Sequence, residues 1–126
     1  MPSDPTTDLV RALIEHMRGA AEDWRTLSIV VELRDGRVGN TFGYTYSPDG
    51  TVSAVASRPS GILPAVQAYL ADKYTPEQEL PLKLLVQFNR DSGTFEITFE
   101  DADAARWKVT PENIDTMSDE LRPEFA

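Results

Sequence analysis

Four carboxylates lie within eight residues near the end of the chain, at Glu96, Glu100, Asp101 and Asp103. Closely spaced oxygen ligands suit Ca²⁺ or Mg²⁺, and paired carboxylates also carry out glycoside hydrolysis. The run lacks the length, the central Gly and the terminal Glu of an EF-hand loop. Glu96 and Glu100 also alternate with apolar strand residues, so they face solvent with no apolar pocket to raise a pKa. We therefore expect neither a metal site nor an acid–base pair here.

Other side chains able to do catalysis are scarce. The chain has no Cys and one His, His16. These counts exclude disulfides, thiolate metal sites and Cys nucleophiles, and they leave too little for a His-based zinc site or a Ser-His-Asp triad. His16 lies beside the apolar stripe of a predicted helix and is expected to be a boundary residue. The composition favours a protein that binds rather than catalyses, without a cofactor.

Negative charge is concentrated at the C-terminal end. Residues 91–126 hold ten acidic and three basic side chains, a net charge of −7, whereas the first 90 residues hold eleven and nine, a net charge of −2. The whole chain has a net charge of −9 and a pI near 4.5. Such a surface attracts basic protein surfaces or cations and repels nucleic acid phosphate. A solvated acidic face without a partner is the competing interpretation.

Length and composition point to one globular domain over residues 1–126, with 40% hydrophobic residues. No apolar run approaches the ~20 residues that a membrane-spanning helix needs. The N-terminus lacks the basic and apolar regions of a signal peptide. We therefore expect a cytoplasmic protein, either a monomer or a homodimer, with no membrane contact.

The apolar periodicity switches between the helical and the strand repeat along the chain. Helices are predicted over residues 7–23, from residue 62 with Pro64 in the first turn, and from the N-cap Thr110 to Leu121. Strands are predicted over 27–33, 42–46, 51–57, 82–88 and 95–99, joined by turns such as Ser47-Pro48-Asp49-Gly50. The order is α-βββ-α-ββ-α. We expect an α+β fold with a five-stranded antiparallel sheet and helices on one face.

The predicted C-terminal helix is the most informative candidate site. Acidic residues at 112, 115 and 119 share one face, opposite an apolar stripe. Asp119 and Glu120 lie in the last turn, where the helix macrodipole disfavours negative charge, so stability alone does not explain them. Trp107 is either a core residue, which is the commoner case, or an exposed anchor. The predicted partner-binding residues are Glu96, Glu100, Asp101, Asp103, Trp107, Glu112, Asp115, Asp119 and Glu120.

Four segments of the chain form a recognisable set: Asp23-Trp24 followed by LSIVVEL, the strand TFGYTY, the helix end AYLADKY and the hairpin LKLLVQFNRDSGTFEITFED. In this order they resemble the YezG-like family of small bacterial immunity proteins, or antitoxins. The tail RWKVTPENIDTMSDELRPEF departs from the family by its length. The resemblance implies a protein that binds and neutralises a cognate toxin, often a nuclease. Because nucleases present basic surfaces, an acidic partner would associate with them rapidly.

A second interpretation follows from the element order, size and low pI, which are similar to those of type III secretion chaperones and YbjN-like proteins. These are dimers that bind extended client segments. The mid-chain helix would then be the dimer surface and would include Tyr69 and Tyr74. An enzyme is the third class considered, and no nucleophile–base pair or metal ligand set supports it.

Overall fold

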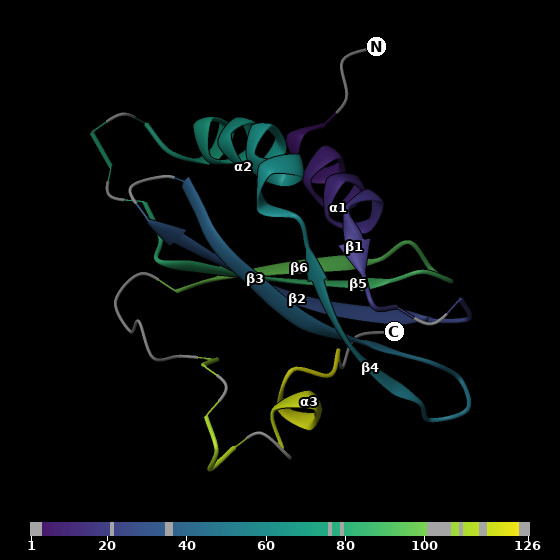
Figure 1. Ribbon diagram of the computed structural model, residues 1–126. Helices are drawn as coiled ribbons and strands as arrows, with labels where there is room; N and C mark the ends of the chain where they lie inside the picture. Colours follow the sequence, from purple (N-terminus) through teal and green to yellow (C-terminus); the bar gives the residue numbers. More distant parts are fainter. Residues whose placement is uncertain are drawn as a thin grey trace.

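The described residues form one antiparallel sheet of six strands, in the order β1-β4-β3-β2-β5-β6 (Figure 1). The computed structural model describes residues 4–20, 22–34, 37–75, 77–78, 80–100, 107–108, 110–113 and 116–123. The strands are β1 (Met17–Arg18), β2 (Thr26–Arg34), β3 (Arg37–Tyr46), β4 (Val52–Ser57), β5 (Lys83–Asn89) and β6 (Phe95–Glu100). The helices are α1 (Pro5–Glu15), α2 (Pro59–Lys73) and α3 (Met117–Glu120). The α+β prediction is confirmed, but the sheet has six strands rather than five.

The sixth strand arises where the first helix was predicted to continue. Asp4 caps α1, since its side chain accepts a hydrogen bond of 3.1 Å from the backbone N–H of Thr6. The helix then ends at Glu15, and β1 pairs with β4. Gly19 has φ +97°, and a Cβ there would lie 2.5 Å from the carbonyl oxygen of Ala54. Glycine therefore lets the chain leave the helix and pass close to β4.

The larger core lies between the sheet and the two long helices, which cover the same face (Figure 1). Alternate residues of the central strand β2, Leu27, Ile29 and Val31, are fully buried on this side. They meet a core group from the helices and the neighbouring strands: Leu9, Val10, Leu13, Trp24, Val55, Ile62, Val66, Tyr69, Leu70, Leu84 and Val86. Fixed alternation along strands and a helical apolar stripe produce this layer as expected.

The opposite face carries a second, smaller core. The prediction that all helices cover one face is wrong, because the C-terminal segment crosses below the sheet (Figure 1). Val30 and Leu85 point to this side and pack with Trp107, Met117 and Leu121. Strands β2 and β5 therefore carry apolar side chains on both faces, as central strands covered on two sides must. The uninterrupted apolar run Ile29-Val30-Val31 is the sequence signal for this.

Two predicted helix starts are also corrected. Helix α2 begins at Pro59, so Pro64 lies inside the helix rather than in its first turn. Thr110 does not start a helix. It begins a turn in which the Asn113 side chain accepts from the Thr110 N–H at 2.7 Å and donates to the carbonyl of Lys108 at 2.8 Å. This local side-chain bonding competes with helix formation, and among the described residues of the C-terminal segment regular helix begins at Met117.

Candidate partner-binding face

The C-terminal segment is held to the sheet by a small set of buried apolar side chains. Trp107, Met117 and Leu121 are 9%, 2% and 1% exposed. They pack against Val30 and Leu85, with Phe42 and Tyr44 at the margin. Trp107 is therefore a core residue, and its ring offers little surface to a partner. A hydrophobic contact of this kind fixes which side chains of the segment turn outward.

Hydrogen bonds to backbone carbonyls complete the docking. The carbonyl of Leu121 accepts from the hydroxyl of Ser28 and from the side-chain N–H of Gln87, the latter at 3.0 Å. The hydroxyl of Tyr46 donates to the carbonyl of Ser118 at 2.5 Å. These bonds satisfy carbonyls at the end of α3, where a helix leaves them without partners. Strands β2, β3 and β5 thus all hold the segment.

Tyr46 has a buried phenol, and its ring is also in contact with the exposed side chain of Arg122. Burial raises the pKa of its phenol well above the ordinary value, because the phenolate would lose its hydration. The guanidinium of Arg122 lies over its ring, 4.6 Å from the centroid. The same guanidinium is 3.6 Å from a carboxylate oxygen of Asp119. Arg122 therefore partly offsets the charge of α3, from a position that is itself exposed.

The acids of the segment point to solvent. Glu112, Asp119 and Glu120 are exposed, and the side chain of Asp119 is 76% exposed despite its contact with Arg122. Glu96 of β6 is also exposed and shares this face, since it lies opposite Gln87 in the register. We call these four exposed side chains, one from β6 and three from the segment that covers the same side of the sheet, the acidic face.

Glu100 differs from the others. It is half-buried and lies opposite Lys83 in the register, while Glu32 lies opposite Lys83 on the other neighbouring strand. Lys83 is 3% exposed, with its Nζ 4.0 Å from a carboxylate oxygen of Glu32. A buried ammonium requires such carboxylates nearby. The register thus places Glu100 opposite a buried lysine, which strand alternation alone does not reveal.

The remaining predicted site residues, Asp101, Asp103 and Asp115, lie outside the described residues. Within the described ranges, no cluster of three or more His, Cys, Asp or Glu side chains could hold a metal ion. Over the same ranges, no helix is both long and apolar enough to cross a bilayer.

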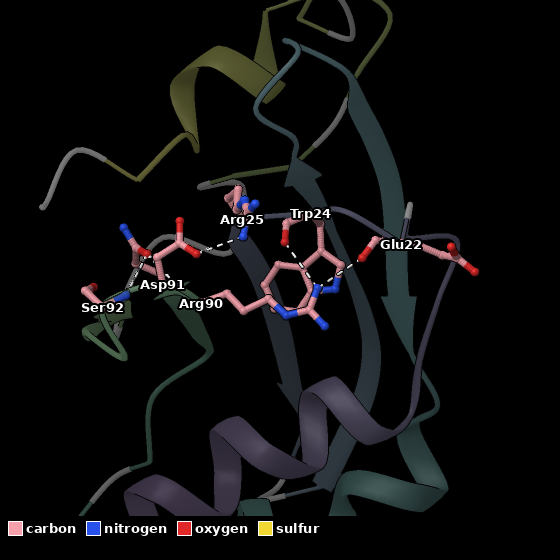
Figure 2. Close-up of polar contacts among 7 residues, drawn as sticks. Glu22, Trp24, Arg25, Arg90, Asp91 and Ser92 are labelled. Carbon is pink, nitrogen blue, oxygen red and sulfur yellow. Dashed lines mark hydrogen bonds and ion pairs between the residues drawn. The ribbon is translucent and has the colours of Figure 1, made fainter.

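A separate polar cluster joins the start of β2 to the β5–β6 turn (Figure 2). The guanidinium of Arg90 lies over the ring of Trp24 at 4.6 Å and donates to the carbonyls of Glu22 and Trp24, each at 3.2 Å. Figure 2 also shows Arg25 donating to a carboxylate oxygen of Asp91 at 2.9 Å. Asp91 is therefore neutralised locally and adds little to the acidic face.

Two cavities lie on the helix-covered side, near the β6 edge. One of about 300 Å³ lies between α1 and the β5–β6 hairpin, and its apolar walls are Val10, Ile14, Phe88 and Phe95. The other, of about 490 Å³, lies at the end of α2 and includes Leu70, Tyr74 and Leu80. Neither of these two cavities includes Glu96, Glu112, Asp119 or Glu120. No protein-family model, no curated protein and no solved structure matches this chain.

Proposed function

We propose that the chain is a non-enzymatic binding protein of the immunity type, which neutralises a basic protein toxin by covering it with the acidic face. That face consists of Glu96, Glu112, Asp119 and Glu120. The observation that carries the proposal is the docking of the C-terminal segment. Trp107, Met117 and Leu121 pack against the sheet, and the described acids of the segment are exposed on this support.

The energetics of the segment favour a binding role over a stabilising one. Asp119 and Glu120 occupy a helix of four residues that contains no basic residue. Neighbouring carboxylates repel each other, and the exposed Arg122 beside Asp119 offsets only part of this repulsion. These charges therefore do not serve stability. Their long-range field can instead attract a basic partner and speed its association.

The client-binding dimer receives less support from the same geometry. Its expected contact surface is the mid-chain helix α2, with Tyr69 and Tyr74 in it. Tyr69 is 3% exposed, and its ring centroid lies 6.2 Å from that of Phe99. It therefore contributes to the monomer's own core rather than to an α2 surface.

The test is a charge reversal with a matched control. Glu112→Lys, Asp119→Lys and Glu120→Lys together change the net charge from −9 to −3. The control, Glu15→Lys, Glu22→Lys and Glu77→Lys, makes the same change at exposed positions elsewhere. We expect tagged wild type and control to retain a basic partner from the native cell, whereas the face variant loses it. The partner is identified by mass spectrometry, and folding is checked by circular dichroism.

Affinity for the captured partner is then measured against salt. Binding through the acidic face should weaken steeply as ionic strength rises. Equal binding by the two triple variants would refute the assigned face, and retention of a client by all forms would favour the chaperone interpretation.

A further inference from the structure

The two edges of the sheet differ in the length and in the side chains of their outer strands. At one edge of the described sheet, β1 has two residues and pairs only with Ala56 and Ser57 of β4, so this edge is divided between two short stretches, β1 and the start of β4. β6 forms the other edge and has six residues, among them the apolar side chains Phe95, Ile97 and Phe99. Phe95 and Phe99 are 40% and 36% exposed, among the most exposed large apolar side chains of the described chain. Long apolar edges invite another strand.

The outer backbone groups of β6 belong to these same residues. Asn89 donates its N–H to the carbonyl of Thr94 at 2.8 Å, so Thr94 points its backbone groups at β5. In an antiparallel pair this direction alternates from one residue to the next. The N–H and C=O groups of Phe95, Ile97 and Phe99 therefore point away from β5. In the described chain β6 pairs only with β5.

The side-chain pattern of this edge is self-complementary. Phe95 and Phe99 lie two residues on either side of Ile97. A two-fold axis through Ile97 would place Phe95 opposite Phe99 of a second copy, and Ile97 opposite its own counterpart. All three residues have outward backbone groups, so they would form the hydrogen-bonded pairs of a new antiparallel ladder. An isologous interface requires such symmetry, whereas a strand from an unrelated protein does not.

The acidic side chains select this register. With the axis at Ile97, Glu96 lies opposite Thr98 of the second copy. Moving the axis by one residue toward Thr98 would oppose Glu96 to Glu100, and moving it toward Glu96 would oppose Glu96 to itself. Like charges directly opposite each other destabilise a strand pair. Of these three axes at the middle of β6, the one at Ile97 pairs aromatic with aromatic and separates the carboxylates.

We propose that the chain forms a homodimer through antiparallel pairing of two β6 edges, with the two-fold axis at Ile97. The apolar cavity of about 300 Å³ beside Phe95 gives Phe99 of the second copy additional apolar surface to contact. The axis is perpendicular to the sheet, so the two acidic faces lie on the same side of one continuous sheet. The inference does not depend on the proposed toxin.

The first test is the molar mass of the full-length chain, measured by light scattering and sedimentation up to millimolar concentration. A strand-edge interface is small, and each copy has a net charge of −9. Association should therefore be weak and should strengthen as salt screens the repulsion. This salt response is opposite to that of a basic partner. A monomer at every concentration and salt level would overturn the proposal.

The second test uses a matched pair of variants. Phe95→Lys places a charge on the proposed edge, whereas Val52→Lys removes an equally exposed apolar side chain, 37% exposed, from β4. We expect Phe95→Lys to weaken dimerisation by about tenfold or more, and Val52→Lys to leave it unchanged. Melting temperature and circular dichroism confirm that both variants fold. Equal effects of the two would show that the edge is not the interface.

The register is tested by cross-linking, since the chain has no cysteine of its own. In the proposed dimer the two Ile97 Cα atoms are about 5.5 Å apart, within disulfide range, whereas the two Thr98 positions are diagonal neighbours about 7–8 Å apart. Ile97→Cys should therefore form a disulfide dimer under mild oxidation far more readily than Thr98→Cys. The reverse order would overturn the assigned axis.

Discussion

The two faces of the sheet are covered in different ways. One face lies under helices of eleven and fifteen residues, and fourteen of the described residues form its buried core. The other lies under the four-residue α3 and the described turns before it, and five of the described residues are buried there. Strand β2 contributes to both cores. We call the side covered by α1 and α2 the thick layer, and the side covered by the C-terminal segment the thin layer. The thin layer depends on a few anchors, and such regions commonly open first and carry binding surfaces.

The largest effect should come from the thick layer. Leu13→Ala removes a fully buried side chain of α1, and we expect the free energy of unfolding to fall by about 2–5 kcal/mol. The loss should affect the whole domain, because α1 packs on α2 and on the sheet. Urea unfolding followed by circular dichroism measures it. A loss below that of Met117→Ala would contradict the ranking of the two layers.

Met117→Ala makes the corresponding change in the thin layer, where Met117 is 2% exposed. We expect a loss at the lower end of the range for core truncations, about 2 kcal/mol, because the short segment can relax around the cavity. Hydrogen exchange should speed up over residues 107–123 while α1 amides stay protected. Equal acceleration in both regions would mean that the two layers unfold as one unit.

Alkaline pH should lower the free energy of unfolding, because Tyr69 and Tyr46 are neutral and buried in the folded state. Burial raises the pKa of Tyr69 to about 12, and it also raises the pKa of Tyr46. A raised pKa in the folded state means that the neutral form is favoured there. Its contribution is complete below pH 10 and is lost as pH rises toward 12, by about 2 kcal/mol at most for Tyr69.

Stability of the wild type measured from pH 9 to 12 should therefore fall, and Tyr69→Phe should reduce the slope, since Phe cannot ionise. Tyr46→Phe also removes the hydrogen bond to Ser118, so it should lower stability at neutral pH as well. An unchanged slope in both variants would remove tyrosine ionisation as the cause.

The smallest effect is expected at Arg122, which stacks on Tyr46 and lies near Asp119. Arg122→Gln should cost about 0.5–1 kcal/mol, because exposed cation–π and ion pairs contribute little. It also makes the acidic face more negative, so affinity for a basic partner should rise while stability falls slightly. Calorimetry measures both quantities. A parallel loss of both would indicate that Arg122 contacts the partner directly.

Local sequence determined most of the elements. Period-two alternation identified β2, β3, β4, β5 and β6, since the pleat fixes the side on which each residue lies. The helical stripe predicted α1, although the helix begins at Pro5 rather than at residue 7. The acidic excess of residues 91–126 was likewise a property of composition. These features depend on neighbours in the chain, so periodicity and residue type are enough to predict them.

Tertiary structure decided the rest. Strand β1 exists because Gly19 allows a close approach to β4, which no local pattern records. The C-terminal segment lies below the sheet because Val30 and Leu85 offer it an apolar surface. Cross-strand register places Glu100 opposite the buried Lys83, whereas Glu96 is exposed, although both residues lie on the same face of β6. Burial and pairing between distant residues set these outcomes, and a sequence pattern does not specify such distances.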